Sequence, residues 1–208
     1  MKKSKRIKKS NSWKIKQHRD QFFKKSKILG YRSRASFKLI ELNNKYKFIK
    51  KNTNLLDLGS CPGGWSQVAS HIITRGRIMS IDIKEMKPLD NIRFLKGDIL
   101  ADEIKSDIMK YFKSNLDVIV SDMAADTTGN KSLDSIRTNQ LCADVINFSK
   151  ETLKPKGVLV SKIFMGEDFL EVKNLAKSTF NKVNFFKPKS SRKESKETYL
   201  HCEILKTL

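Results

Sequence analysis

Residues 55–66 read Leu-Leu-Asp-Leu-Gly-Ser-Cys-Pro-Gly-Gly-Trp-Ser, and this stretch decides the fold of the chain. The mostly apolar segment 55–58 is typical of a buried parallel strand, and the glycines at 59, 63 and 64 let the backbone approach a ligand closely. A helix that begins directly after them offers free N–H groups to the ligand's polar edge. The stretch therefore predicts a strand, a ligand-binding turn and a helix.

The glycine spacing distinguishes between kinds of nucleotide site. A dinucleotide-binding turn needs G-x-G-x-x-G and a phosphate loop needs G-K-[ST], and neither pattern is present here. The next predicted strand, 77–82, ends at Asp82, about 20 residues past the turn, where a carboxylate can accept hydrogen bonds from both ribose hydroxyls of an adenosine cofactor. A third strand ends near Asp98, which could meet the adenine amino group. Together these elements predict a site for S-adenosylmethionine (SAM).

Strand and helix patterns alternate along the rest of the chain. Helical patterns cover 33–47, 64–74, 101–112, 132–152 and 167–179, and Ser33 is the predicted N-cap of the first. Strand patterns cover 54–58, 77–82, 91–95, 116–121, 157–164, 182–187 and 198–205. Alternation predicts an α/β, Rossmann-like SAM-dependent methyltransferase fold, with a seven-stranded, mostly parallel sheet and helices on both faces. A short basic turn separates the last two strands, so we expect a hairpin and an antiparallel last strand.

Length and composition limit the class of protein. A chain of 208 residues, 38% of them hydrophobic, can form one domain with a proper core. No apolar run approaches the roughly 18 residues of a membrane span, and no signal-peptide pattern is present, so we expect a cytoplasmic protein. The cysteines and histidines are scattered, so no disulfide framework or metal site is predicted. Oligomeric state leaves no sign in the sequence, and we expect a monomer.

The net charge of +21 points to a polyanionic partner. An AT-rich genome could enrich lysine everywhere, but the charge is concentrated: residues 1–38 hold fifteen Lys or Arg against the single acid Asp20. We therefore predict a basic, flexible RNA-binding arm over residues 1–30, followed by one catalytic domain over 31–208. A second basic stretch, 187–193, supports RNA contact, and a solubilising tail is the alternative for the arm.

Candidate catalytic residues lie where the predicted strands end. Asp122 comes at the end of the fourth strand, Lys162 lies near the end of the fifth, Glu197 opens the last strand, and Lys38 on the first helix could reach the same face. The chain lacks the [DN]-P-P-[YF] run typical of base N-methylation. It also lacks a substrate-loop cysteine for pyrimidine C5-methylation, since Cys61 lies inside the predicted cofactor turn.

Lys162 interrupts an otherwise apolar strand. A buried lysine is costly without a partner, so its presence needs an explanation. It could reach the rim of the fold, or pair with Asp122 only for stability. We favour a functional role because Lys162 falls at the carboxyl edge of the sheet, where ligands bind in open α/β folds.

From about Ser33 to the C-terminus, the chain resembles the FtsJ/RrmJ family of ribosomal RNA ribose 2′-O-methyltransferases. The resemblance lies in residues 33–39, 57–67, 121–124 and 161–162. A Lys-Asp-Lys-Glu tetrad forms the active site of that family, and the matching positions are Lys38, Asp122, Lys162 and Glu197, with Glu194 as the alternative for the last. The family's SAM contacts match Gly63, Trp65, Asp82, Asp98 and Asp122.

The resemblance implies methylation of a uridine in the aminoacyl-tRNA-binding loop of 23S rRNA, within the assembled large ribosomal subunit. Relatives that act on tRNA or mRNA caps share the tetrad, and a non-catalytic rRNA-binding assembly factor is the more distant alternative. We expect Lys162 to orient and help deprotonate the 2′-hydroxyl, with Asp122 holding Lys162, and Lys38 and Glu197 fixing the ribose. The charge on Lys38 favours a neutral Lys162, whereas the two acids favour its ammonium form, and the sequence leaves this open.

Overall fold

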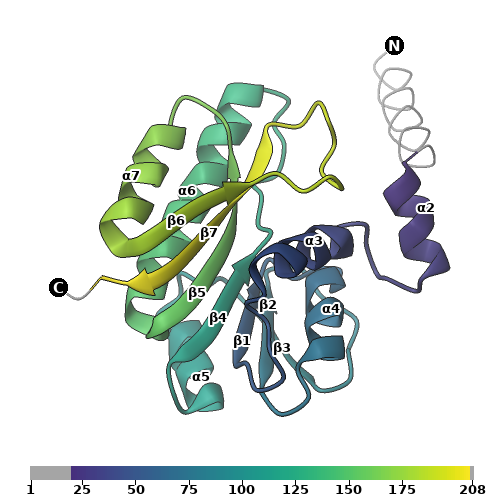
Figure 1. The fold of residues 1–208 in the computed structure, drawn as a ribbon, viewed down its shortest axis with the longest axis vertical. Helices are drawn as coiled ribbons and strands as arrows, with labels where there is room; N and C mark the ends of the chain where they lie inside the picture. Colours follow the sequence, from purple (N-terminus) through teal and green to yellow (C-terminus); the bar gives the residue numbers. More distant parts are fainter. Residues whose placement is uncertain (1–19, 207–208) are drawn as a thin grey trace.

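One seven-stranded sheet organises the structure, a computed structural model that describes residues 20–206 (Figure 1). The strands are β1 (Leu55–Leu58), β2 (Ile78–Asp82), β3 (Ile92–Lys96), β4 (Leu116–Ser121), β5 (Leu153–Phe164), β6 (Phe180–Phe186) and β7 (Glu197–Leu205). They lie in the order β3-β2-β1-β4-β5-β7-β6. Strands β1 to β5 run parallel, and β7 is antiparallel to both of its neighbours, β5 and β6. The predicted α/β fold and its antiparallel last strand are confirmed.

Helices cover both faces of this sheet. They are α2 (Gln21–Ile28), α3 (Ser36–Tyr46), α4 (Gly64–Ile72), α5 (Asp102–Phe112), α6 (Lys131–Thr152) and α7 (Phe169–Thr179). Helices α3 and α4 pack on one face, and α5, α6 and α7 pack on the other. Within residues 20–206, none of these helices has both the length and the apolar composition needed to cross a membrane.

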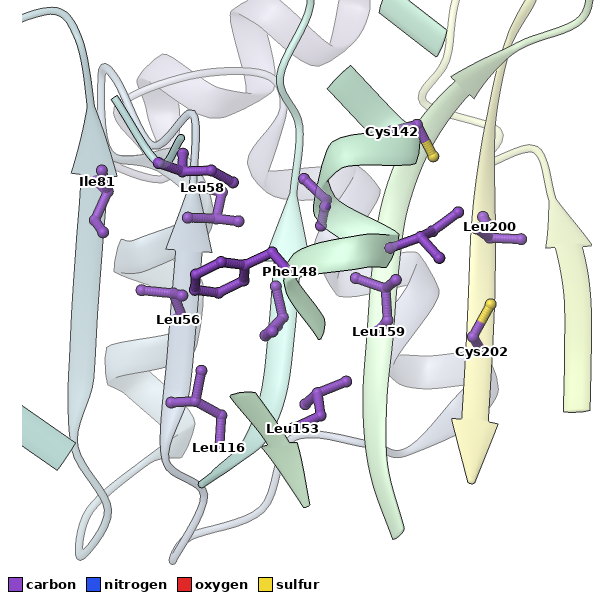
Figure 2. Close-up of a cluster of buried hydrophobic side chains, with 14 of the residues drawn as sticks. Leu56, Leu58, Ile81, Leu116, Cys142, Phe148, Leu153, Leu159, Leu200 and Cys202 are labelled. Atoms are coloured by element: carbon purple, nitrogen blue, oxygen red, sulfur yellow. The ribbon is translucent and has the colours of Figure 1, made fainter. Parts of the chain in front are cut away.

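Strand β1 shows why leucines dominate the centre of the sheet. Leu56 and Leu58 point into the cluster that includes Phe148 of α6, as Figure 2 shows, whereas Leu55 belongs to the cluster under α3 and α4. All three leucines are fully buried. Burial of each contributes about 1.5–3 kcal/mol, which favours apolar residues on both faces of a covered strand.

The strand register brings distant segments to one edge of the sheet. Leu58, the last residue of β1, is paired with Ser121 of β4, which is paired with Ser161 of β5. Because β7 runs the other way, its first residue, Glu197, is paired with Phe164 at the end of β5. The glycine turn after β1, the segment after β4, the end of β5 and the start of β7 therefore meet.

The prediction of Ser33 as a helix N-cap is wrong. Helix α3 begins at Ser36, and its N-cap, Ala35, makes no side-chain capping bond. Residues 33–36 form a tight turn in which the Ser36 N–H donates to the Ser33 carbonyl oxygen at 3.3 Å. The Ser33 hydroxyl instead lies against Gly64, at the place that a Cβ on Gly64 would occupy. A tertiary contact with α4 thus uses the side chain that was expected to cap α3.

The predicted arm over residues 1–30 contains a helix, α2, that the sequence analysis does not predict. Asp20 is its N-cap, and its carboxylate accepts hydrogen bonds from the Phe22 and Phe23 N–H groups at 3.0 and 3.3 Å. An aspartate at this position is a recognisable helix N-cap, but the many lysines around it favour the prediction of a flexible arm instead. Residues 1–19 of the predicted arm lie outside the described residues, and the domain boundary near residue 30 stays a prediction.

His201 gives this fold a testable pH dependence. The ring is fully buried in β7 and stacks on Tyr46 with centroids 3.8 Å apart, and neither ring nitrogen has a hydrogen-bond partner among the described residues. Burial lowers the pKa of His201 to about 4, although Glu203 opposes the shift. As the pH falls from about 6.5 to 4, the unfolded chain takes up the proton first, so stability falls over that range.

We expect a His201→Phe variant to keep the ring stacking and lose this pH dependence. Between pH 7 and pH 5, His201 should lower the free energy of unfolding of the wild type by about 2 kcal/mol, because each unit of pKa difference corresponds to about 1.4 kcal/mol. The variant should not show this loss. Urea titrations at both pH values measure the difference. A difference between variant and wild type that is the same at both pH values would show that His201 does not cause the dependence.

Candidate active site

Four charged side chains meet where the strands converge. Lys38 comes from α3, Asp122 directly follows β4, Lys162 lies near the end of β5, and Glu197 begins β7. The Lys162 Nζ lies 2.8 Å from Asp122 Oδ1 and donates to the Asp122 carbonyl oxygen at 2.7 Å, while the Lys38 Nζ lies 2.8 Å from Glu197 Oε2. Longer contacts of 3.7 Å (Lys38 to Asp122) and 3.9 Å (Lys162 to Glu197) close the ring. We call these four residues the tetrad.

The tetrad is buried and formally neutral. Its side chains are only 8–16% exposed, and two lysines balance two carboxylates. Burial raises the pKa of Asp122, but Lys162 and then Lys38 lower it by more, so the pKa lies below its ordinary value. Removing one member would leave a buried charge without its partner, which typically costs about 3–5 kcal/mol.

Two further side chains, which the sequence analysis did not single out, hold the carboxylates. The Tyr199 phenol donates to Asp122 Oδ1 at 2.6 Å, and burial raises its pKa well above the ordinary value, so it stays a donor. The Ser191 hydroxyl donates to Glu197 Oε1 at 2.7 Å. A signal for Tyr199 was available, because alternate residues of a strand share a face and Tyr199 is two residues after Glu197.

A cavity of about 600 Å³ adjoins the tetrad. Its lining includes Gly59 of the glycine turn, Asp82 at the end of β2, Asp98 after β3, and both Asp122 and Met123 after β4. Gly59 has a φ of +72°, and a Cβ there would lie 3.1 Å from the Met123 backbone, so only glycine fits. The cavity lies at the carboxyl edge of the sheet, and a volume of roughly 300–1,000 Å³ is usual for a small-molecule site.

The cavity's carboxylates are oriented and keep acceptor capacity. Asp82 Oδ2 accepts from the Cys61 N–H and Oδ1 from the Lys84 N–H, both at 2.8 Å. Asp98 Oδ1 accepts from the Leu100 N–H at 3.0 Å. Because a carboxylate has about four lone-pair positions, Asp82 can still accept from two ribose hydroxyls and Asp98 from an amino group. These residues fit the predicted adenosine cofactor.

A second cavity, of about 520 Å³, lies at the opposite edge of the sheet. Its lining includes Lys50, Lys154 and Lys156 and no member of the tetrad. We assign the cofactor to the first cavity, because ligands of open parallel sheets bind outside the carboxyl ends of the strands.

Gly63 and Trp65, two of the predicted cofactor contacts, do not line the cavity. Gly63 has a φ of +104° and packs against Arg32. Trp65 is buried, and its indole N–H donates to the Ala35 carbonyl oxygen at 2.8 Å. It thereby ties α4 to the start of the helix that carries Lys38. A role for Gly63 and Trp65 in cofactor binding stays a prediction.

Asp57 is a further buried carboxyl group near the glycine turn. Burial raises its pKa to about 7, although the Ser66 hydroxyl, which donates to Oδ2 at 2.5 Å, opposes the shift. The Ser66 and Ser80 hydroxyl oxygens lie 2.7 Å apart, so the group links β1, α4 and β2. Asp57 therefore connects the three elements at the junction from which the glycine turn emerges.

We expect Asp82→Ala to weaken SAM binding about 100-fold, because two charge-assisted hydrogen bonds to the ribose are lost. Isothermal titration calorimetry measures the dissociation constant. Asp90→Ala, an exposed carboxylate further along the same segment, is the matched control. A dissociation constant within threefold of wild type for Asp82→Ala, with the fold intact, would contradict the assignment of Asp82.

The strand order, the helices on both faces and the glycine turn at the carboxyl edge define the class of Rossmann-like methyltransferases. A solved structure described as a ribosomal RNA methyltransferase from Plasmodium falciparum has the same fold. It is 33% identical and superposes with a TM-score of 0.75, covering 84% of this chain and 98% of that one.

The model of the FtsJ-like methyltransferase family matches residues 31–204. This chain belongs to that family, which confirms the resemblance seen in the motifs. A ribosomal RNA large subunit methyltransferase E from Pelagibacter ubique is 47% identical over 197 residues, covering 95% of this chain and 97% of the relative. A protein of the same name from Rickettsia akari is 41% identical over 202 residues, covering 94% and 89%.

Proposed function

We propose that this protein transfers the methyl group of SAM to the 2′-oxygen of a ribose in ribosomal RNA of the large subunit. The target that we propose is a uridine in the aminoacyl-tRNA-binding loop of 23S rRNA, and we expect a cytoplasmic monomer. The observation that carries the proposal is the closed tetrad of Lys38, Asp122, Lys162 and Glu197 beside a cavity that fits an adenosine cofactor. The names of the curated relatives support rRNA as the substrate.

The tetrad can hold and deprotonate a ribose hydroxyl. Bound SAM supplies an electrophilic methyl group on its sulfonium sulfur. The Lys162 Nζ makes two contacts with Asp122, one with Oδ1 at 2.8 Å and one with the carbonyl oxygen at 2.7 Å. These contacts fix the Nζ and leave its remaining hydrogen-bonding position free to face the 2′-oxygen. Attack of the 2′-oxygen on the methyl carbon requires the hydroxyl to give up its proton, and Lys162 can take that proton once its own ammonium group has released one to solvent; the electrons of the C–S bond would stay on sulfur. Lys38 and Glu197 fix the ribose and balance the charge.

Exposed basic residues on two linked elements support an RNA partner. Helix α2 exposes Lys24, Lys25 and Lys27, and the loop between β6 and β7 exposes Lys189 and Arg192. The two elements are linked, because the Asp20 carboxylate that caps α2 lies 3.9 Å from Arg192 Nε. Lysine and arginine side chains displayed on linked elements can neutralise several phosphates of a structured RNA.

The substrate is tested with radiolabelled SAM on three RNAs in parallel: large ribosomal subunits that lack the modification, free 23S rRNA and bulk tRNA. We expect label on the large subunit. Label on tRNA alone would keep the chemistry and overturn the substrate. Absence of label on every RNA, with SAM binding intact, would instead support a non-catalytic assembly factor.

A further inference from the structure

The loop between β6 and β7 carries a buried hydroxyl that reaches the tetrad. Ser191 is only 7% exposed, although Lys189 and Arg192 in the same loop are exposed. Its hydroxyl donates to Glu197 Oε1 at 2.7 Å, and the other oxygen of that carboxylate, Oε2, lies 2.8 Å from Lys38. The two oxygens of Glu197 thus have different partners, one in the tetrad and one in the loop.

We propose that Ser191 is a positioning residue: it sets the rotation of the Glu197 carboxylate so that Oε2 faces Lys38. The proposal rests on the proposed function, because it assigns Ser191 a role in that reaction. A carboxylate held at one oxygen only can turn about its terminal torsion, which is broad and roughly two-fold. Hydrogen bonds at both oxygens remove that freedom and keep the longer 3.9 Å contact between Lys162 and Glu197 in place.

Helix α3, which carries Lys38, also binds the loop between β6 and β7, which carries Ser191. Glu41 lies three residues after Lys38 on α3, and its two carboxylate oxygens accept from the N–H groups of Lys189 (2.6 Å) and Ser190 (3.0 Å). Arg34, just before α3, donates to the Ser190 carbonyl oxygen. Helix α3 therefore helps to position both partners of Glu197. Lys38 belongs to the helix, and Ser191 lies in the loop that the helix holds.

Ser190 provides a matched control in the same loop. Its side chain is fully buried, as that of Ser191 nearly is, but its hydroxyl has no hydrogen-bond partner among the described residues. Truncating Ser190 to alanine removes the same atom from the adjacent position and leaves the backbone bonds to Glu41 intact. A general effect of cavity formation in the loop would appear in both variants, whereas positioning of Glu197 would be lost only in Ser191→Ala.

The test compares Ser191→Ala, Ser191→Thr and Ser190→Ala on large subunits at saturating SAM. We expect Ser191→Ala to lower kcat about tenfold, because a hydrogen bond to a charged group of the tetrad is lost, with the KM for the subunit and the SAM dissociation constant within twofold. Ser191→Thr, which keeps the hydroxyl, should restore most of kcat, and Ser190→Ala should stay within twofold of wild type. Wild-type kcat in Ser191→Ala, or equal losses in both alanine variants, would overturn the proposal.

A structural measurement separates this proposal from the proposed function. In a crystal structure of Ser191→Ala, we expect the Glu197 carboxylate to be rotated and the 2.8 Å contact to Lys38 to be lengthened or broken. That outcome can be observed whether or not the wild type methylates any RNA tested. An unchanged Glu197 would overturn the positioning role even if the enzyme proves active, and an inactive wild type with a rotated Glu197 in the variant would count against the proposed function alone.

Discussion

Replacing Lys162 with methionine is expected to abolish methyl transfer and leave SAM binding in place. The variant keeps an unbranched side chain of similar length in β5 but removes the amine that lies 2.8 Å from Asp122. If Lys162 orients and deprotonates the 2′-hydroxyl, kcat should fall by about 1,000-fold, within the range that a positioned acid or base contributes. Asp122 retains the Tyr199 phenol at 2.6 Å and Lys38 at 3.7 Å, so the cofactor cavity should persist.

Single-turnover methyl transfer and calorimetric SAM binding measure the two effects separately. Lys177→Met, an exposed lysine on α7, controls for the loss of one positive charge toward RNA. Full turnover by Lys162→Met would show that Lys162 serves stability alone, the alternative that the sequence left open.

Asp122→Asn is expected to lower both activity and stability. The change leaves two buried lysines with Glu197 as their remaining carboxylate in the tetrad, and it weakens the acceptor of the Tyr199 phenol. The free energy of unfolding should fall by about 3 kcal/mol at pH 7, and methyl transfer should fall more than about 100-fold.

The pH dependence of this loss follows from the lowered pKa of Asp122. An acid whose pKa is lower in the folded state stabilises the fold above its unfolded pKa, near 3.8, and loses that contribution as the pH falls through the folded pKa. The difference between wild type and Asp122→Asn should therefore be full at pH 7 and shrink below about pH 4. Asp107→Asn, in an exposed pair with Lys110, is the control and should stay within about 0.5 kcal/mol of wild type. An equal loss in Asp107→Asn would contradict the account.

The sheet edge was predictable because local patterns determine it. The run 55–66 predicts a strand, a turn and a helix, and the structure has β1, the turn and α4 there. Parallel strands then carry their ends to one edge, which is why Asp122 and Lys162 could be expected together. Strand position also separates the two candidate acids: Glu197 opens β7 and reaches Lys38, whereas Glu194 is exposed in the preceding loop.

The remaining features depend on contacts between segments far apart in the sequence. Ser191 lies in a loop that Glu41, about 150 residues earlier, holds against α3. Helix α2 is short and rich in lysine, and it is stabilised by tertiary contacts such as that of Phe22 with Phe37, whose ring centroids lie 5.5 Å apart. Local propensity is too weak to reveal such an element, because most helical stability in proteins comes from tertiary packing.

The most direct test of the account is to locate the transferred methyl group within its nucleoside. Large-subunit RNA is treated with the protein and isotopically labelled SAM, digested to nucleosides and analysed by tandem mass spectrometry. The tetrad around Lys162 predicts that the label stays with the ribose fragment of a 2′-O-methyluridine and is missing when Lys162→Met is used. Label on the base fragment would contradict the account, because the tetrad would then be serving a different reaction.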